Sequence, residues 1–262
     1  MTPTPPTEII TLAGLRIQHA VAGTGKPIVF LHGWGAHLGL VWDLAQRFIP
    51  LGYQVHALDL PAFGASQTPA SAWTVYDYAQ FVLDYLDAQG LSQVYLFGHS
   101  FGGRLGIILG ARHPERLLKM ALADSAGVRP KTPLSARLRL GLYKRLRDTL
   151  YQLGATALAD SLRARYNARY GSSDFQATDG ILRQIFLQVI QEDLLPLAAQ
   201  VKPSTLLFWG DQDQDTPLWQ GQLLEKTMPD AGLIVYAGAG HYSYLEHSAA
   251  TAHTMHHFFS HS

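Results

Sequence analysis

The serine in the segment LFGHSFGG is the strongest candidate in this sequence for a reacting side chain. Gly98, Ser100 and Gly102 follow a short apolar run directly and precede a helical pattern, which predicts a tight turn between a strand and a helix. Such a turn strains the serine and exposes its hydroxyl. A Cβ at either glycine would collide with the neighbouring strand or helix. We predict that Ser100 is a nucleophile; the alternative is a glycine-rich packing turn.

Two backbone N–H groups are candidates to bind an oxyanion that forms on the attacked carbon. Phe101 opens the helix after the serine, so its N–H points toward that oxygen. The segment FLHGWG offers a second donor, the N–H of Trp34 between Gly33 and Gly35, on a strand expected beside that of the serine. Loss of one such donor typically costs about 2.7–4 kcal/mol of barrier. We expect His32 to hold this loop through hydrogen bonds rather than to act as a base.

The elements that must position these residues alternate between apolar strands and helical segments. This alternation predicts an α/β fold, a mostly parallel eight-stranded sheet with helices on both faces after an antiparallel start. Functional residues of such sheets follow the carboxyl ends of the strands. Two strands are expected within 8–22, with a turn at 13–14, and the others at 27–33, 53–60, 93–98, 117–124, 205–210 and 232–238; helices are expected at 37–51, 74–90, 101–113, 217–228 and from about 246.

Residues 125–200 interrupt the alternation with helical stretches and no convincing strand. We therefore predict a core domain of residues 1–124 and 201–262 and an inserted helical cap of residues 125–200. Between residues 129 and 169, ten Lys and Arg residues oppose two Asp residues, a net charge of +8. This charge indicates a solvated helix face or a surface that attracts anionic substrates or a membrane. We expect five aromatic side chains either to form the core of the cap or to line an apolar roof above the serine: Tyr143, Tyr166, Tyr170, Phe175 and Phe186.

The composition excludes several classes of protein. The formal net charge is zero, and 47% of the residues are hydrophobic, so nothing global points to nucleic acid. Cysteine is absent, which excludes disulfides, a thiol nucleophile and Cys-based zinc sites. The first residues show no basic segment followed by an apolar one, and no apolar run approaches the roughly 20 residues of a membrane span. We expect a cytoplasmic protein without a membrane span.

The motifs HGWG, DLPAFGAS, GHSFGG, WGDQD and GAGH together resemble those of the α/β-hydrolase-fold superfamily, in particular serine carboxylesterase-like members with a helical cap. They occur in the family's order over almost the whole chain, with Ala62 where the family usually has glycine. The resemblance implies a triad in the chain order Ser…Asp…His. Its base is His241, which alone among twelve histidines follows the last strand in a glycine-rich loop. The resemblance implies neither a cofactor nor a metal.

The segment DQDQD, residues 211–215, places three carboxylates at alternate positions. A calcium loop that began at its first residue would need glycine where Thr216 stands and a bidentate glutamate where Gln222 stands. The sequence therefore fails the calcium pattern at two positions.

The family pattern around this segment implies that Asp213 is the triad acid. Its carboxylate would accept a hydrogen bond from Nδ1–H of His241, which sets the tautomer of the ring and stabilises the imidazolium. We expect Asp211 and Asp215 to be solvated bystanders. Asp124, at the end of an earlier strand, is the alternative acid.

These residues predict a serine hydrolase that cleaves carboxylic esters of short to medium acyl chain through an acyl-enzyme intermediate. Its partner would be a small-molecule ester. One alternative is a C–C bond hydrolase of the meta-cleavage-product type, which uses the same triad and whose anionic substrates would suit a basic cap. Another is a ligand receptor that keeps the triad but turns over slowly; turnover above about 1 per second would exclude it.

Overall fold

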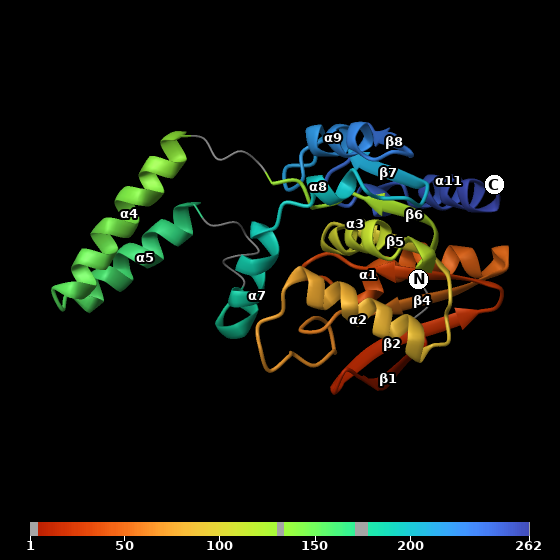
Figure 1. The fold of residues 1–262 in the computed structure, drawn as a ribbon, viewed down its shortest axis with the longest axis horizontal. Coiled ribbons are helices and arrows are strands. Elements are labelled where there is room, and N and C mark those ends of the chain that lie inside the picture. Colours follow the sequence, from red (N-terminus) through yellow and green to blue (C-terminus); the bar gives the residue numbers. More distant parts are fainter. Residues whose placement is uncertain (1–4, 130–133, 171–177, 262) are drawn as a thin grey trace.

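The computed structural model describes residues 5–129, 134–170 and 178–261, with an eight-stranded sheet at its centre (Figure 1). The strands are β1 (Thr7–Leu12), β2 (Leu15–Gly23), β3 (Lys26–Leu31), β4 (Tyr53–Leu58), β5 (Val94–His99), β6 (Leu117–Ala123), β7 (Thr205–Gly210) and β8 (Ala231–Tyr236). Their order in the sheet is β1-β2-β4-β3-β5-β6-β7-β8. The pairs β1–β2 and β2–β4 are antiparallel and the remaining pairs are parallel. The predicted fold class is confirmed.

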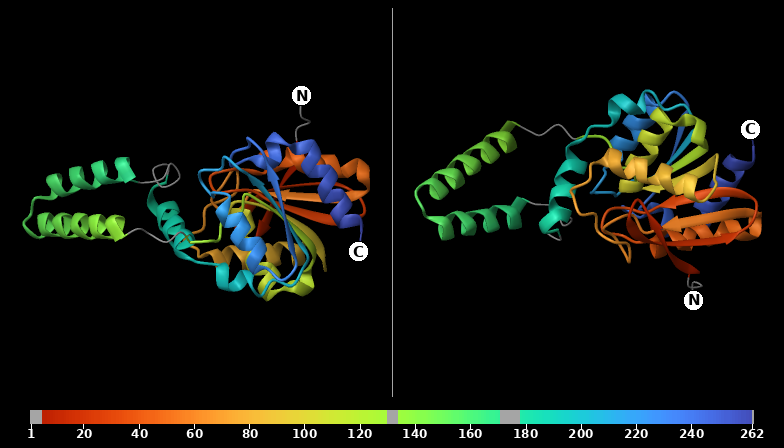
Figure 2. Two further views of the ribbon diagram at one scale, coloured as in Figure 1. Left: turned by 90° about the horizontal axis from the view of Figure 1, so that it is seen from above. Right: turned by 60° about the horizontal axis from the view of Figure 1, so that its bottom comes forward.

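Helices cover both faces of the sheet, as Figure 2 shows. Clusters of buried side chains place α2, α3, α8 and α9 on one face and α1, α10 and α11 on the other. The helices are α1 (Leu38–Ala45), α2 (Val75–Ala88), α3 (Phe101–Arg112), α4 (Leu134–Gln152), α5 (Thr156–Tyr170), α7 (Gly180–Gln191), α8 (Leu195–Ala198), α9 (Trp219–Thr227), α10 (Ser243–Glu246) and α11 (Ser248–Ser260), with 3₁₀ turns η1 (Gln46–Leu51) and η2 (Pro114–Arg116).

The central strands are apolar at successive positions because both of their faces are buried. Along β3, Val29 and Leu31 belong to the cluster under α2 and α3, whereas Ile28 and Phe30 belong to the cluster under α1 and α11. All four side chains are fully buried. Successive residues of a strand point to opposite faces, so a continuous apolar run is what a sheet between two helical layers requires.

Two predicted helices show how local sequence sets their bounds. Thr74 and Asp77 form a capping box at the start of α2: each side chain accepts a hydrogen bond from the backbone N–H of the other residue. The predicted helix 37–51 is α-helical only as far as Ala45 and continues as the 3₁₀ turn η1. Pro50 lies within η1, where it has no N–H to donate to an α-helical hydrogen bond.

The segment between β6 and β7 contributes α4, α5, α7 and α8. The first two form an antiparallel hairpin that extends away from the sheet (Figures 1 and 2). Tyr143 of α4 stacks on Tyr166 of α5 with the ring centroids 3.9 Å apart. The leucines along α4 face outward: Leu138 and Leu142 are 66% and 71% exposed. None of the helices in the described part of the chain combines the length and the apolar character that a membrane span requires.

Candidate active site

Ser100 occupies a strained turn between β5 and α3, with φ 50° and ψ −104°. Two close backbone approaches make this turn possible. A Cβ at Gly98 would lie 2.5 Å from the carbonyl oxygen of Gly102, and a Cβ at Gly102 would lie 2.4 Å from that of Leu31. Glycine is therefore required on both sides of the serine, and the turn presents the serine hydroxyl beyond the end of the strand.

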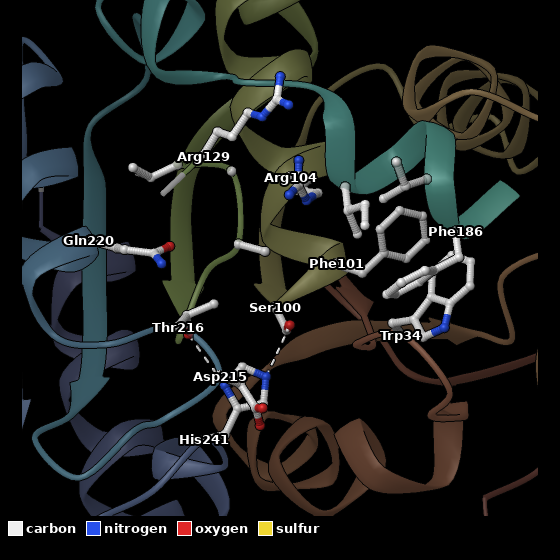
Figure 3. A pocket seen from close by; sticks show the side chains of 15 residues that line it. Trp34, Ser100, Phe101, Arg104, Arg129, Phe186, Asp215, Thr216, Gln220 and His241 are labelled. Atoms are coloured by element: carbon white, nitrogen blue, oxygen red, sulfur yellow. Dashed lines mark hydrogen bonds between the residues drawn. The ribbon is translucent and has the colours of Figure 1, made fainter. Parts of the chain in front are cut away.

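One line of hydrogen bonds joins Ser100, His241 and Asp213. Nε2 of His241 lies 3.0 Å from Oγ of Ser100, and Nδ1 lies 2.8 Å from Oδ2 of Asp213. The three residues come from loops that follow β5, β8 and β7, so the sheet brings together positions that are far apart in sequence (Figure 3 shows Ser100 and His241). The Asp213 side chain is fully buried and that of His241 is 14% exposed. The arrangement allows His241 to take the proton of the serine hydroxyl while Asp213 holds the ring.

The surroundings of Asp213 keep it ionised. Its Oδ1 accepts the backbone N–H groups of Asp215 and Thr216, and its Oδ2 also accepts the Thr216 hydroxyl at 2.7 Å. Burial raises the pKa of Asp213, but the hydrogen bonds from His241 and Thr216 outweigh burial, and the pKa is lowered overall. For His241 burial lowers the pKa, whereas the hydrogen bond and charge of Asp213 raise it further than burial lowers it. The pair therefore favours a protonated imidazole once the serine has lost its proton.

Asp124, the alternative acid, points elsewhere. Its Oδ1 accepts the Gly210 N–H at 3.0 Å, and its Oδ2 accepts the N–H and hydroxyl of Ser243 at 3.0 and 2.7 Å. Burial raises the pKa of Asp124 to about 7, although these hydrogen bonds lower it. Its carboxylate thus ties the end of β7 to α10, and the acid that reaches Nδ1 of His241 is Asp213.

His32 makes hydrogen bonds in the loop after β3 and to the segment after β4. His32 is fully buried; its Nε2 accepts the Leu60 N–H at 3.0 Å, so its Nδ1 carries the proton and donates to the Gly33 oxygen at 2.7 Å. Burial lowers the pKa of His32 to about 4, so the ring is neutral at pH 7. The backbone N–H groups of Trp34 and Phe101 donate no hydrogen bond to any described residue. Two unused donors therefore accompany the serine.

His99 is a positioning residue that sequence reasoning missed. Its Nε2 lies 2.8 Å from the carbonyl oxygen of His241, and because a carbonyl only accepts, Nε2 carries the proton. Burial lowers the pKa of His99 to about 3, which leaves the ring neutral. The only signal in the sequence is the histidine directly before the serine in GHSFGG. Thr216, which contacts Asp213, gives no such signal.

A pocket of about 230 Å³ opens above Ser100 (Figure 3). Its walls are mainly apolar and include Trp34, Phe101 and, from α7, Phe186 and Val189. Of the five aromatic residues expected in the cap, Phe186 alone lines this pocket among those that the structure describes; Tyr143, Tyr166 and Tyr170 pack within the α4–α5 hairpin, and Phe175 lies outside the described residues. The apolar wall above the serine therefore comes from α7, because α4 and α5 pair with each other.

Asp215, which was expected to be a solvated bystander, lies at the edge of the pocket. Asp215 is exposed, yet it lines the pocket beside His241, and its negative charge is one of those that raise the pKa of His241. Oxygens of Asp213 and Asp215 and a nitrogen of His241 lie within 4.8 Å of one another, a spacing compatible with a metal ion. However, the hydrogen bonds from His241 and Thr216 already use the Asp213 oxygens, and Nδ1 of His241 bears a proton rather than a free lone pair. Asp213 and His241 therefore form a hydrogen-bonded pair, and Asp215 adds a negative charge beside it.

Comparison with known proteins gives the family. Residues 26–179 match the family model described as the α/β hydrolase fold, and residues 190–262 match one described as TAP-like protein. The chain belongs to the α/β hydrolase fold family.

Three of its relatives indicate the chemistry. A pimeloyl-[acyl-carrier protein] methyl ester esterase from Chromobacterium violaceum is 30% identical over 86% of this chain and 91% of its own. A 2-hydroxymuconate semialdehyde hydrolase from a Pseudomonas strain is 30% identical over 94% of this chain and 90% of its own. The crystal structure of a bacterial membrane phospholipase A is 28% identical, with a TM-score of 0.73 over 98% of this chain and 86% of its own. All three names describe hydrolases, which supports hydrolase activity in this chain.

Proposed function

We propose that this protein is a serine hydrolase that cleaves carboxylic esters of short to medium acyl chain through an acyl-enzyme on Ser100. The observation that carries the proposal is the line of hydrogen bonds from Ser100 through His241 to Asp213, at 3.0 and 2.8 Å, on the floor of an apolar pocket. The methyl ester esterase among the relatives supports the same reaction.

The reaction would start with attack of Ser100 Oγ on the ester carbonyl while Nε2 of His241 takes the hydroxyl proton. The N–H groups of Trp34 and Phe101, which donate to no described residue, would bind the oxyanion. His241 would then give the proton to the departing alkoxide, and the acyl group would remain on the serine. Water, deprotonated by the same histidine, would release the acid and restore the enzyme.

The size of the pocket supports small acyl groups. About 230 Å³ lies below the usual range of roughly 300–1,000 Å³ for sites that hold drug-sized ligands. Its apolar walls would hold an acyl chain, and α7 would cover that chain. We retain residues 125–200 as the cap and a small-molecule ester as the partner; a cytoplasmic location remains a prediction from the sequence.

The test is hydrolysis of p-nitrophenyl esters from acetate to a long-chain acyl ester by the wild type, Ser100→Ala and the matched control Ser92→Ala, whose serine is exposed away from the pocket. We expect fast hydrolysis with an optimum at short or medium acyl length. Ser100→Ala should lose it and Ser92→Ala should keep it. Substantial activity in Ser100→Ala would show that the nucleophile lies elsewhere.

A second candidate is the C–C bond hydrolase. Arg104 and Arg129 line the pocket and would suit an anionic substrate, and the 2-hydroxymuconate semialdehyde hydrolase is an equally similar relative. If the folded wild type hydrolysed none of the esters but cleaved an anionic dienone in a Ser100-dependent way, this candidate would replace the first.

A further inference from the structure

The pocket contains a buried cation that the ester mechanism does not use. Arg104 lies on α3, one helical turn after the serine, and its backbone N–H donates to the carbonyl oxygen of Ser100 at 3.3 Å. The residue is 7% exposed and lines the pocket. Helical side chains point back toward the N-terminus of their helix, which is the end of α3 that follows Ser100. Figure 3 shows Arg104 and Ser100 in the same pocket.

Arg104 has no ion-pair partner among the residues that the structure describes. Its side-chain Nη1 donates a hydrogen bond to the backbone carbonyl of Glu192, at 2.9 Å. The carboxylate of Glu192 accepts the Tyr76 hydroxyl at 2.6 Å, and that of Asp193 accepts the N–H groups of Arg129 and Leu195.

The charge of Arg104 persists at neutral pH. Burial lowers the pKa of Arg104 to about 10, although the charges of Glu192 and Asp193 raise it. A buried charge without an ionic partner is costly to the fold. A negatively charged ligand would compensate that charge.

The charges in the pocket are separated along its length. Figure 3 shows Arg104 and Arg129 toward one end and His241 with Asp215 toward the other, with Ser100 between them. The negative charges of Asp213 and Asp215 act on His241 at its end. An anionic group on a substrate would therefore be attracted to the arginines and repelled by the carboxylates at the histidine end.

This separation of charge indicates which half of an ester would lie at each end of the pocket. His241 must give its proton to the leaving alkoxide, so the alcohol portion lies at the histidine end. The acyl chain then extends toward Arg104. A carboxylate at the far end of that chain would meet a planar guanidinium, which binds carboxylates through two parallel hydrogen bonds.

We infer, on the basis of the proposed function, that Arg104 binds a carboxylate at the distal end of the acyl chain and that the preferred substrates are half-esters of short dicarboxylic acids. Arg129 lies on the same side of the pocket and is exposed, so its contribution should be smaller. Arg104 is thus a specificity-determining residue for the ester reaction.

The experiment compares monomethyl esters of succinate, glutarate and adipate with the same esters in which the free carboxylate is a neutral carboxamide. We expect the wild type to prefer the carboxylate by about 10- to 100-fold in kcat/KM at the best chain length, as hydrogen bonds to a charged group allow. Arg104→Met should abolish this ratio and Arg104→Lys should restore part of it. Arg112→Met, an exposed change on the same helix outside the pocket, should keep the ratio.

If Arg104 only holds the Glu192 carbonyl in place, its replacement should lower kcat/KM equally for the carboxylate and the carboxamide esters. The ratio between the two series would then be unchanged. Such a result would overturn the inference. If Arg104→Met does not fold, the wild type alone decides: glutarate monoamide, which keeps one carboxylate, should inhibit p-nitrophenyl acetate hydrolysis at least ten-fold more strongly than the neutral diamide. Equal inhibition would again contradict the role.

A third series places the carboxylate on the alcohol portion, as in the acetate ester of 4-hydroxybenzoate against that of its amide. A preference only in this series would overturn the assignment of the acyl side. Ser100-dependent hydrolysis of p-nitrophenyl esters without any preference for carboxylates would end this inference and leave the proposed function intact. Hydrolysis of no ester at all would end both.

Discussion

The loops at the carboxyl ends of the strands and the α4–α5 hairpin differ in how their side chains find partners. At the strand ends, Asp213 accepts hydrogen bonds from His241, Thr216 and Asp215, and Asp124 ties β7 to α10. On the hairpin, leucines along α4 are largely exposed. Contacts between distant segments therefore specify the geometry of the site, whereas α4 and α5 are specified mainly by each other. Substitutions in the two regions test this contrast.

The largest effect on the strand-end side should come from Asp213→Asn. The amide can offer an N–H group to Nδ1 of His241, which favours the tautomer with the proton on Nε2, so the ring cannot accept the serine proton. We expect kcat to fall by about 10³- to 10⁴-fold with the fold intact. Steady-state kinetics and circular dichroism measure both properties.

Asp211→Asn is the matched control for that change. Oδ1 of Asp211 accepts the Gly238 N–H at 2.8 Å, and an amide oxygen can do the same. We expect kcat within two-fold of the wild type, an ordinary surface effect. Comparable losses in both variants would mean that the acid is not specific to position 213.

Truncation of a buried leucine in the sheet should destabilise the protein more than truncation of an exposed leucine in the hairpin, an effect of intermediate size. Leu122→Ala in β6 removes a fully buried side chain and should lower the free energy of unfolding by about 2–5 kcal/mol. Leu142→Ala in α4 changes a side chain that is 71% exposed and should alter it by less than about 0.5 kcal/mol. Urea unfolding of the two variants gives the difference. A loss of 2 kcal/mol in Leu142→Ala would show that the leucine face of α4 is covered in solution.

The smallest effect concerns Asp215. Its negative charge raises the pKa of His241, and the base works only when that histidine is neutral. Asp215→Asn should therefore lower this pKa and move the acid limb of the kcat/KM profile to lower pH. Water screens the exposed charge of Asp215, so the effect should be small. We expect kcat/KM at pH 6 to rise by roughly two- to five-fold.

Asp211→Asn serves as the control here too and should leave the acid limb in place, since Asp211 accepts the Gly238 N–H and does not line the pocket. A limb that moved to higher pH in Asp215→Asn would contradict the electrostatic role of this residue.

Sequence reasoning succeeded where the requirement is local. Gly98 and Gly102 are needed because a Cβ would strike backbone atoms, and that collision can be expected from a strand, a tight turn and a helix. The alternation of apolar strands with helices likewise predicted the eight-stranded sheet, because a buried strand is apolar on both faces.

Sequence reasoning missed features that depend on where separate loops meet. His99 contacts the backbone of a residue 142 positions away. The sequence around Arg104 does not distinguish it from other basic residues of a helix, and only the structure shows that it lines the pocket. In the hairpin, the helical stretch expected within residues 125–200 is present, but the four-residue spacing of Leu138, Leu142 and Leu146 carries no information about what that face contacts. Periodicity specifies which residues share a face, whereas packing partners depend on the rest of the chain.

Reaction with a fluorophosphonate followed by peptide mass spectrometry tests directly whether Ser100 is an activated nucleophile. We expect one phosphonyl group per chain, on the peptide that contains Ser100, with labelling strongly reduced in His241→Ala and absent in Ser100→Ala. Labelling of a different residue, or none on the folded wild type, would contradict this role of Ser100.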